Sequence, residues 1–167
     1  MKIMGEASYV DSKGHRFEIE GIGNISDDLE LKSLHIEGES RGSRINVETL
    51  EVEGEISVDE IIATNLDIEG ILKSSKVQAG KISIESQSGK IGEIQCKSIR
   101  VFNNRKSKSR VQIDRIVASE IDLENCDVES IECTNAIIRS NCAIRNLSVK
   151  GDYKIDSDSK VDEIIKI

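Results

Sequence analysis

The sequence predicts an all-β fold: a single-stranded parallel β-helix in which short strands wind into a three-sided solenoid. Three observations predict it. An apolar-x-apolar triplet returns at a nearly constant interval, Ile, Leu and Val recur throughout a chain with 32% charged and 2% aromatic residues, and none of the 167 residues is proline. A fixed repeat with a narrow aliphatic core is typical of stacked, similar turns.

One column of triplets runs along nearly the whole chain. Its members are Phe17/Ile19, Leu34/Ile36, Leu50/Val52, Leu66/Ile68, Ile82/Ile84, Ile99/Val101, Ile116/Ala118, Ile131/Cys133 and Leu147/Val149. Successive triplets are separated by fifteen to seventeen positions, so they predict about nine turns of that length.

Two further columns complete each turn. The second precedes the first by five residues: Leu29/Leu31, Ile45/Val47, Ile61/Ala63, Val77/Ala79, Ile94/Cys96, Val111/Ile113, Cys126/Val128 and Cys142/Ile144. The third is ragged, with Ile56/Val58, Ile121/Leu123, Ala136/Ile138 and Tyr153/Ile155, and it fails over residues 37–44 and 102–110. Three columns indicate three sides.

Alternation within each triplet indicates strands. Two apolar side chains lie on one face and the polar middle residue on the other, which is the two-residue period of a strand. On a helix of 3.6 residues per turn, the observed spacings would scatter the apolar residues around the axis. The absence of proline suits ladders in which nearly every backbone N–H is paired.

Domain organisation is simple. We expect one β-helix domain over residues 16–167, preceded by a segment, residues 1–15, that could cap the first turn. The first residues, Met1 to Glu6, lack the long apolar region of a secretory signal, and no apolar run approaches the roughly 18 residues of a membrane span. We therefore expect a cytoplasmic protein, with peripheral contact at the inner membrane as a further option.

Cysteine spacing favours packing over metal binding. Cys96, Cys126, Cys133 and Cys142 are separated by thirty, seven and nine positions, which matches no zinc pattern. Each falls where the repeat places an apolar side chain. We predict small buried thiols in a reducing compartment and no metal ligands.

The phrases Leu34-His-Ile-Glu-Gly38, Leu50-Glu-Val-Glu-Gly54 and Leu66-Asp-Ile-Glu-Gly70 repeat in succession. This pattern resembles the bactofilins, a family of polymer-forming bacterial cytoskeletal proteins. The resemblance implies a right-handed three-sided β-helix that joins end to end into nonpolar filaments without nucleotide and scaffolds cell-shape or envelope machinery. The chain departs from that family in lacking proline-rich tails and an apolar N-terminal membrane-targeting peptide.

Catalysis finds little support. β-Helical acyltransferases use a six-residue repeat and a histidine base, whereas the step here is predominantly five and the two histidines, His15 and His35, are expected to be solvated. Sugar-cleaving enzymes need paired carboxylates beside aromatic platforms. Glu51, Glu53 and Glu55 form an acidic row, but at outward positions. We predict no catalytic residue, no cofactor-binding residue and no metal site.

A basic stretch interrupts one turn. Its cations are Arg105, Lys106, Lys108 and Arg110. They could bind an anionic partner, so a β-helical adaptor that does not polymerise is the alternative function, and a β-helix enzyme is a weaker one. Since no aromatic residue interleaves the cations, we expect no specific nucleic acid binding.

Charge is banded along the chain. Residues 16–72 carry 4 basic and 15 acidic side chains, residues 73–115 carry 11 and 3, and residues 116–167 carry 6 and 11. In a solenoid, position in the sequence is position along the axis. The acidic, basic and acidic bands should favour staggered lateral contact between rods, with protein partners on the outer faces.

The principal predicted partner is a second copy of the chain. A parallel solenoid cannot close its own edges, so each end leaves unpaired N–H and C=O groups. The C-terminal interface is predicted at Val161, Ile164, Ile165 and Ile167. The N-terminal interface is predicted at Phe17, Ile19, Ile22 and Ile25. We therefore expect a structural homopolymer that assembles end to end.

Overall fold

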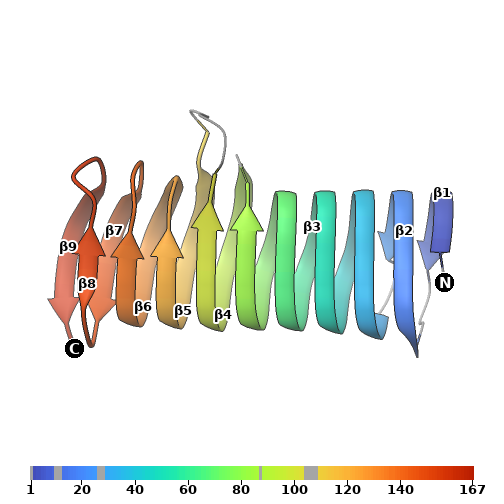
Figure 1. Cartoon of the computed structure of the whole chain (residues 1–167), viewed down its shortest axis with the longest axis horizontal. Helices are drawn as coiled ribbons and strands as arrows, with labels where there is room; N and C mark the ends of the chain where they lie inside the picture. The colour runs from blue at the N-terminus through green and yellow to red at the C-terminus, as the bar shows by residue number, and fades with distance from the viewer. Residues whose placement is uncertain (1, 10–12, 26–28, 87, 104–108) are drawn as a thin grey trace.

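The computed structural model describes residues 2–9, 13–25, 29–86, 88–103 and 109–167. It is all-β, with parallel strands stacked as a β-solenoid of about eight turns, close to the nine predicted, and no helix in the described residues. The turns succeed one another in chain order from one end of a rod to the other, with the two termini at opposite ends (Figure 1). The predicted fold class is confirmed.

The described residues form nine strands of one sheet. They are β1 (Lys2–Tyr9), β2 (Lys13–Ile25), β3 (Leu29–Glu85), β4 (Gly89–Phe102), β5 (Val111–Leu123), β6 (Cys126–Ile138), β7 (Ala143–Val149), β8 (Tyr153–Ile155) and β9 (Lys160–Lys166). β3 is a continuous strand of 57 residues that winds through several turns (Figure 1). The sheet order is β1-β2-β3-β4-β5-β6-β7-β9, with β8 beside β6, and every pairing is parallel.

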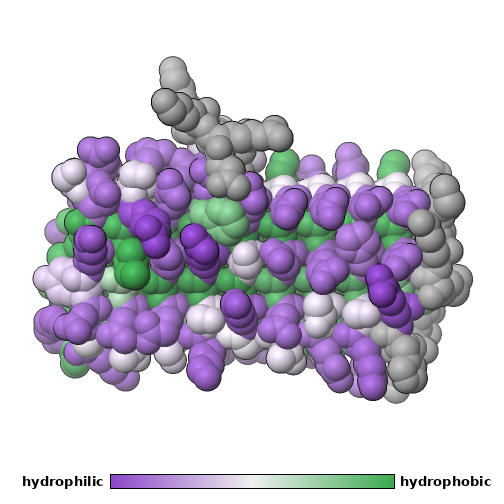
Figure 2. All heavy atoms as spheres, viewed as in Figure 1, coloured by the Kyte–Doolittle hydropathy of each residue, from purple (hydrophilic) through white to green (hydrophobic). Residues whose placement is uncertain are grey.

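The core is a column of aliphatic side chains inside the solenoid. One turn shows the pattern, with three buried pairs, Ile45/Val47, Leu50/Val52 and Ile56/Val58, each residue at most 5% exposed. We call these the second, first and third sides, after the columns of the sequence. The residues between pairs point outward, and hydrophilic side chains cover much of the face seen in Figure 2.

The predicted register fails at one turn. It holds up to Ile99, which pairs with Ile82, but Ile99 then pairs with Ile121 rather than with Ile116. Ile116 instead continues the second side, opposite Ile94. The step from Ile99 to Ile121 is five positions longer than the step from Ile82 to Ile99, and the additional residues fall between β4 and β5.

This long turn shifts the later columns by one side. The first side continues through Ile121/Leu123, Ala136/Ile138 and Tyr153/Ile155, and the third through Val111/Ile113, Cys126/Val128 and Cys142/Ile144. The apolar residues themselves were placed correctly facing inward. Only the column to which each belongs was wrong, because all three sides share the same alternation.

The N-terminal residues extend the sheet. β1 pairs with β2 in continuous register, from Lys2 opposite Glu18 to Tyr9 opposite Ile25. Parallel pairing of this kind makes residues 2–9 a further strand of the solenoid, so within the described residues the sheet already includes Lys2 and does not start at residue 16.

Glycine turns the corner that follows the first side. Gly21, Gly38, Gly54 and Gly70 have φ of 113°, 123°, 136° and 141°, a region that side chains other than glycine rarely adopt. They also stack closely, since a Cβ on Gly54 would lie 2.1 Å from the carbonyl oxygen of Gly38. This corner explains why the sequence repeats Glu-Gly.

Candidate functional site

The last turn of the solenoid has an uncovered edge. Among the described residues, β8 pairs only with β6, and β9 pairs only with β7. The C-terminus lies in this turn, at the end of the rod (Figure 1). Backbone N–H and C=O groups along such an edge are available to another strand.

Apolar side chains are exposed at this end because the core column stops. Ile164 pairs with the fully buried Leu147 yet is 40% exposed, and Tyr153 pairs with the buried Ala136 yet is 42% exposed. Val161 is half-buried against the core. These inward positions are covered one turn earlier and uncovered here, so they form an apolar end surface.

Ile165 and Ile167 lie differently from this end surface. Ile165 pairs with Ser148 and alternates with the inward Ile164, so its side chain lies on the outer flank. Ile167 follows β9, and its backbone N–H donates to the carbonyl oxygen of Val149 at 3.2 Å. Of the four residues predicted for the C-terminal interface, Val161 and Ile164 have the inward positions at the end.

Sequence reasoning missed Tyr153 in the end surface. The triplet Tyr153/Ile155 was visible in the repeat, but its place in the final turn follows only from its pairing with β6. The ammonium of Lys166 lies 5.3 Å from the centre of the Tyr153 ring and also donates to the carbonyl oxygen of Gly151. A cation therefore lies over the aromatic part of the end surface.

The predicted N-terminal interface is not at an open edge. Phe17, Ile19 and Ile25 are buried in the core, and β1 pairs over the strand that contains them. Ile22 is 44% exposed and pairs with Glu39. Because β1 adds a strand beyond these residues, the expectation that all four form the free N-terminal edge is corrected.

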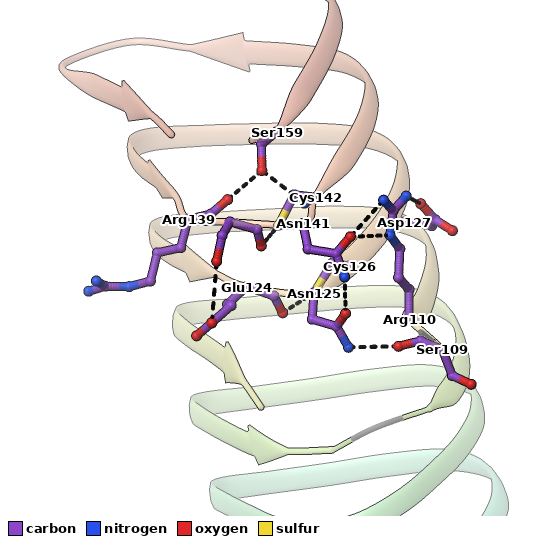
Figure 3. Close-up of polar contacts among 11 residues, drawn as sticks. Ser109, Arg110, Glu124, Asn125, Cys126, Asp127, Arg139, Asn141, Cys142 and Ser159 are labelled. Carbon is purple, nitrogen blue, oxygen red and sulfur yellow. Dashed lines mark hydrogen bonds and ion pairs between the residues drawn. The ribbon is translucent and has the colours of Figure 1, made fainter. Parts of the chain in front are cut away.

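The basic stretch is described only in part. Arg105, Lys106 and Lys108 lie outside the described residues. Arg110 is described, and its guanidinium joins neighbouring turns instead of facing solvent freely (Figure 3). Its Nη1 donates to Asp127 Oδ1 at 2.8 Å, and its Nε and Nη2 donate to Asn141 Oδ1 at 3.2 and 2.8 Å. The guanidinium of Arg110 is thus already bound by Asp127 and Asn141, and its expected role in binding an anionic partner stays a prediction.

Beyond the long turn, the corner that follows the first side is formed by asparagines whose side chains bond from one turn to the next. Asn125 and Asn141 have φ of 59° and 58°, the left-handed region in which asparagine is enriched. Asn125 Nδ2 donates to the carbonyl oxygen of Ser109 at 2.8 Å, and Asn141 Nδ2 donates to Asn125 Oδ1 (Figure 3). The sequence carries a signal for this feature, the dipeptide Asn-Cys, which is repeated one turn later.

The cysteines are free thiols, and three are buried, as predicted. Cys126, Cys133 and Cys142 are at most 2% exposed, and Cys96 is half-buried. Burial raises the pKa of Cys96 to about 12. Burial, with the nearby carboxylates of Glu120 and Glu132, raises the pKa of Cys133 to about 11. Both thiols are thus held in the neutral, unreactive form.

His35 lies on the outer face, as predicted, among carboxylates. Its Nδ1 is 3.4 Å from a carboxylate oxygen of Glu51, and its Nε2 is 3.8 Å from Glu37. Ligand-type atoms of His35, Glu37 and Glu53 lie within 4.8 Å of one another. Stacked outward acids of this kind need no ligand to explain them, and the prediction of no metal site stays a prediction.

Comparisons with known protein families, curated proteins and solved structures found no match. Within the described residues, no helix has the length and apolar character to cross a bilayer.

Proposed function

We propose that this chain is a structural protein that assembles end to end into filaments without bound nucleotide. The observation that carries the proposal is the uncovered edge of β8 and β9 with the exposed side chains Tyr153 and Ile164. The proposed partner is a second copy, whose end turn continues the parallel ladder or meets it edge to edge.

The energetics of a solenoid support end-to-end contact. Each turn is stabilised by its neighbours, so a terminal turn lacks about half of its contacts. A second copy would pair the free N–H and C=O groups and bury the apolar end surface at the same time. Exposed strand edges that are neither capped nor blocked favour such association.

The resemblance to bactofilins leads to the same proposal. The Glu-Gly repeat that carries the resemblance is also the glycine corner of the solenoid. A bactofilin-like filament would scaffold cell-shape or envelope machinery. Four free cysteines suit the reducing cytoplasm, which is where we propose the filament forms, with peripheral contact at the inner membrane as an option.

Neighbouring residues of β9 provide a matched test. Ile164→Arg places a charge on the end surface, whereas Ile165→Arg places the same charge on the outer flank. We expect the unmodified protein and Ile165→Arg to form micrometre-scale fibres at near-physiological salt, and Ile164→Arg to remain folded but give short fibres or none. Electron microscopy and sedimentation measure assembly, and circular dichroism checks the fold.

Two outcomes would reject end-to-end stacking at this terminus. One is normal filaments from Ile164→Arg. The other is loss of single filaments in the Lys106→Glu/Lys108→Glu variant, which would instead place the contact on the side of the rod.

A further inference from the structure

Two cysteines lie on top of each other inside the solenoid. Cys126 and Cys142 are one turn of the solenoid apart, and the residues after them pair directly, Asp127 with Ala143 and Val128 with Ile144. Both thiols are buried at the start of the third side (Figure 3). Each follows an asparagine in the left-handed conformation, so both chain segments enter the side in the same way.

The two thiols donate hydrogen bonds to neighbouring backbone carbonyl groups of the same turn. Cys142 Sγ reaches back to the preceding turn, where it donates to the carbonyl oxygen of Leu123 at 3.4 Å. Cys126 Sγ donates to the carbonyl oxygen of Glu124 at 3.3 Å. The thiols are also close enough for a hydrogen-bonding interaction that lowers the pKa of Cys142 and raises that of Cys126.

The other two cysteines have no thiol opposite them. Cys96 lies between Ala79 and Ala118, and Cys133 lies between Ala118 and Val149. The chain therefore contains a thiol pair together with two solitary thiols in comparable strand positions, which serve as internal controls.

Strand geometry allows the pair to bond. Neighbouring strands are about 4.8 Å apart, and disulfides span Cα separations of about 4.4–6.8 Å. We propose that Cys126 and Cys142 form a redox pair that closes into a disulfide between adjacent turns when the chain meets a peroxide.

The chemistry takes two steps. The Cys142 thiolate attacks one oxygen of hydrogen peroxide, the O–O bond breaks, and sulfenic acid and hydroxide result. The Cys126 sulfur then attacks the sulfenic sulfur, the S–S bond forms, and the sulfenic oxygen leaves as water with the proton of the Cys126 thiol. In total the two thiols lose two electrons, and one hydrogen peroxide is reduced to two molecules of water. A small dithiol reverses the reaction.

Local opening of the last turn would give hydrogen peroxide access to Cys142. The backbone N–H of Cys142 donates to Ser159 Oγ at 2.8 Å, and Ser159 belongs to the final turn, beside the uncovered edge. Terminal elements open locally at a lower free energy than the core. The closed disulfide would tie two successive turns together next to this end.

The test uses the full chain and hydrogen peroxide. We expect the unmodified protein and the Cys96→Ala/Cys133→Ala variant each to lose about 2 Da, reversibly with dithiothreitol. Peptide mapping without reduction should find the Cys126–Cys142 link. Cys126→Ala should instead leave a sulfenic acid on Cys142 that a dimedone probe captures, and Cys142→Ala should give neither product.

Three results would overturn the proposal. They are a disulfide that includes Cys96 or Cys133, a crosslink between chains in place of the internal one, and dimedone capture at Cys126 rather than Cys142 in the single variants. Circular dichroism of each variant shows whether it is folded, and the doubly substituted chain, which keeps the pair, tests the proposal even if a single variant unfolds.

Discussion

The corner after the first side is built in two ways in the two halves of the rod. From Gly21 to Gly70 it is turned by glycines whose backbones stack directly on one another. At Asn125 and Asn141 it is turned by left-handed asparagines whose side chains form the ladder. The described N-terminal corner is therefore marked by close backbone stacking, and the C-terminal corner by a network of side-chain hydrogen bonds.

The charges on the outer surface beside this corner also differ between the two halves of the rod. In the N-terminal half, the outward residue before each glycine is an acid, and Glu20 pairs directly with Glu37. In the C-terminal half, opposite charges meet across turns, as in Arg139 Nη2 to Asp122 Oδ2 at 2.8 Å and Arg145 Nη1 to Glu129 Oε1 at 2.7 Å. Beside this corner the glycine half stacks acids, whereas the asparagine half has an ion pair; farther along the N-terminal half, Lys73 and Glu55 also pair across turns.

The largest expected effect is at the glycine corner. Gly54→Val should destabilise the fold by about 2–5 kcal/mol, because valine strains a φ of 136° and its Cβ meets the Gly38 carbonyl oxygen. Urea unfolding measures the change. A midpoint equal to that of the unmodified protein would show that the backbone stack is not required.

The asparagine corner should lose less. Asn141→Ala should cost about 1–3 kcal/mol, since alanine is strained at a φ of 58° and the bonds to Arg110 and Asn125 are lost. Asn141→Gly keeps the conformation and should recover part of the loss. Equal urea midpoints for the two variants would mean that the side-chain ladder, and not the backbone conformation, dominates.

Reversing one charge should change the stability of the fold in opposite directions in the two halves of the rod. Glu53→Lys relieves a stack of acids beside Gly54 and should stabilise the fold by about 0.2–1 kcal/mol at low salt. Asp122→Lys removes the partner of Arg139 and Arg100 and should destabilise it. Thermal melts at low and high salt measure both changes, and a loss of stability in Glu53→Lys would contradict the repulsion between stacked acids.

At neutral pH the smallest expected effect is that of the solitary thiols, because their contribution changes only in alkaline solution. The folded pKa values of Cys96 and Cys133, about 12 and about 11, exceed the ordinary 9.0, so the unfolded chain loses these protons first. Their contribution to stability is present below pH 9 and is lost as pH rises toward the folded values. Cys96→Ala/Cys133→Ala should flatten the fall in urea midpoint between about pH 8 and about pH 10.5. An unchanged slope would contradict the raised pKa values.

Parts of the candidate site followed from the sequence. Ile164 is predicted at the C-terminal interface, and the structure gives it an inward, exposed position in the last turn, while its role in assembly stays a prediction. Ile165 was assigned the same role because an apolar alternation with two adjacent isoleucines does not show which of them faces inward. The sequence places Arg110 with the cations that could bind an anionic partner and does not reveal its partners Asp127 and Asn141, because these are distant in sequence and adjacent only after the turns stack.

The sequence by itself determined the strands, the solenoid and the inward residues, because the alternation of apolar and polar side chains is a local property of the chain. Only the tertiary structure decided which columns join beyond the long turn, that β1 pairs over Ile19, Ile22 and Ile25, and that Cys126 lies against Cys142. The reason is physical: all three sides carry the same two-residue alternation, so a shift by one side leaves every local preference satisfied, and only the hydrogen-bond ladder between successive turns distinguishes one register from another.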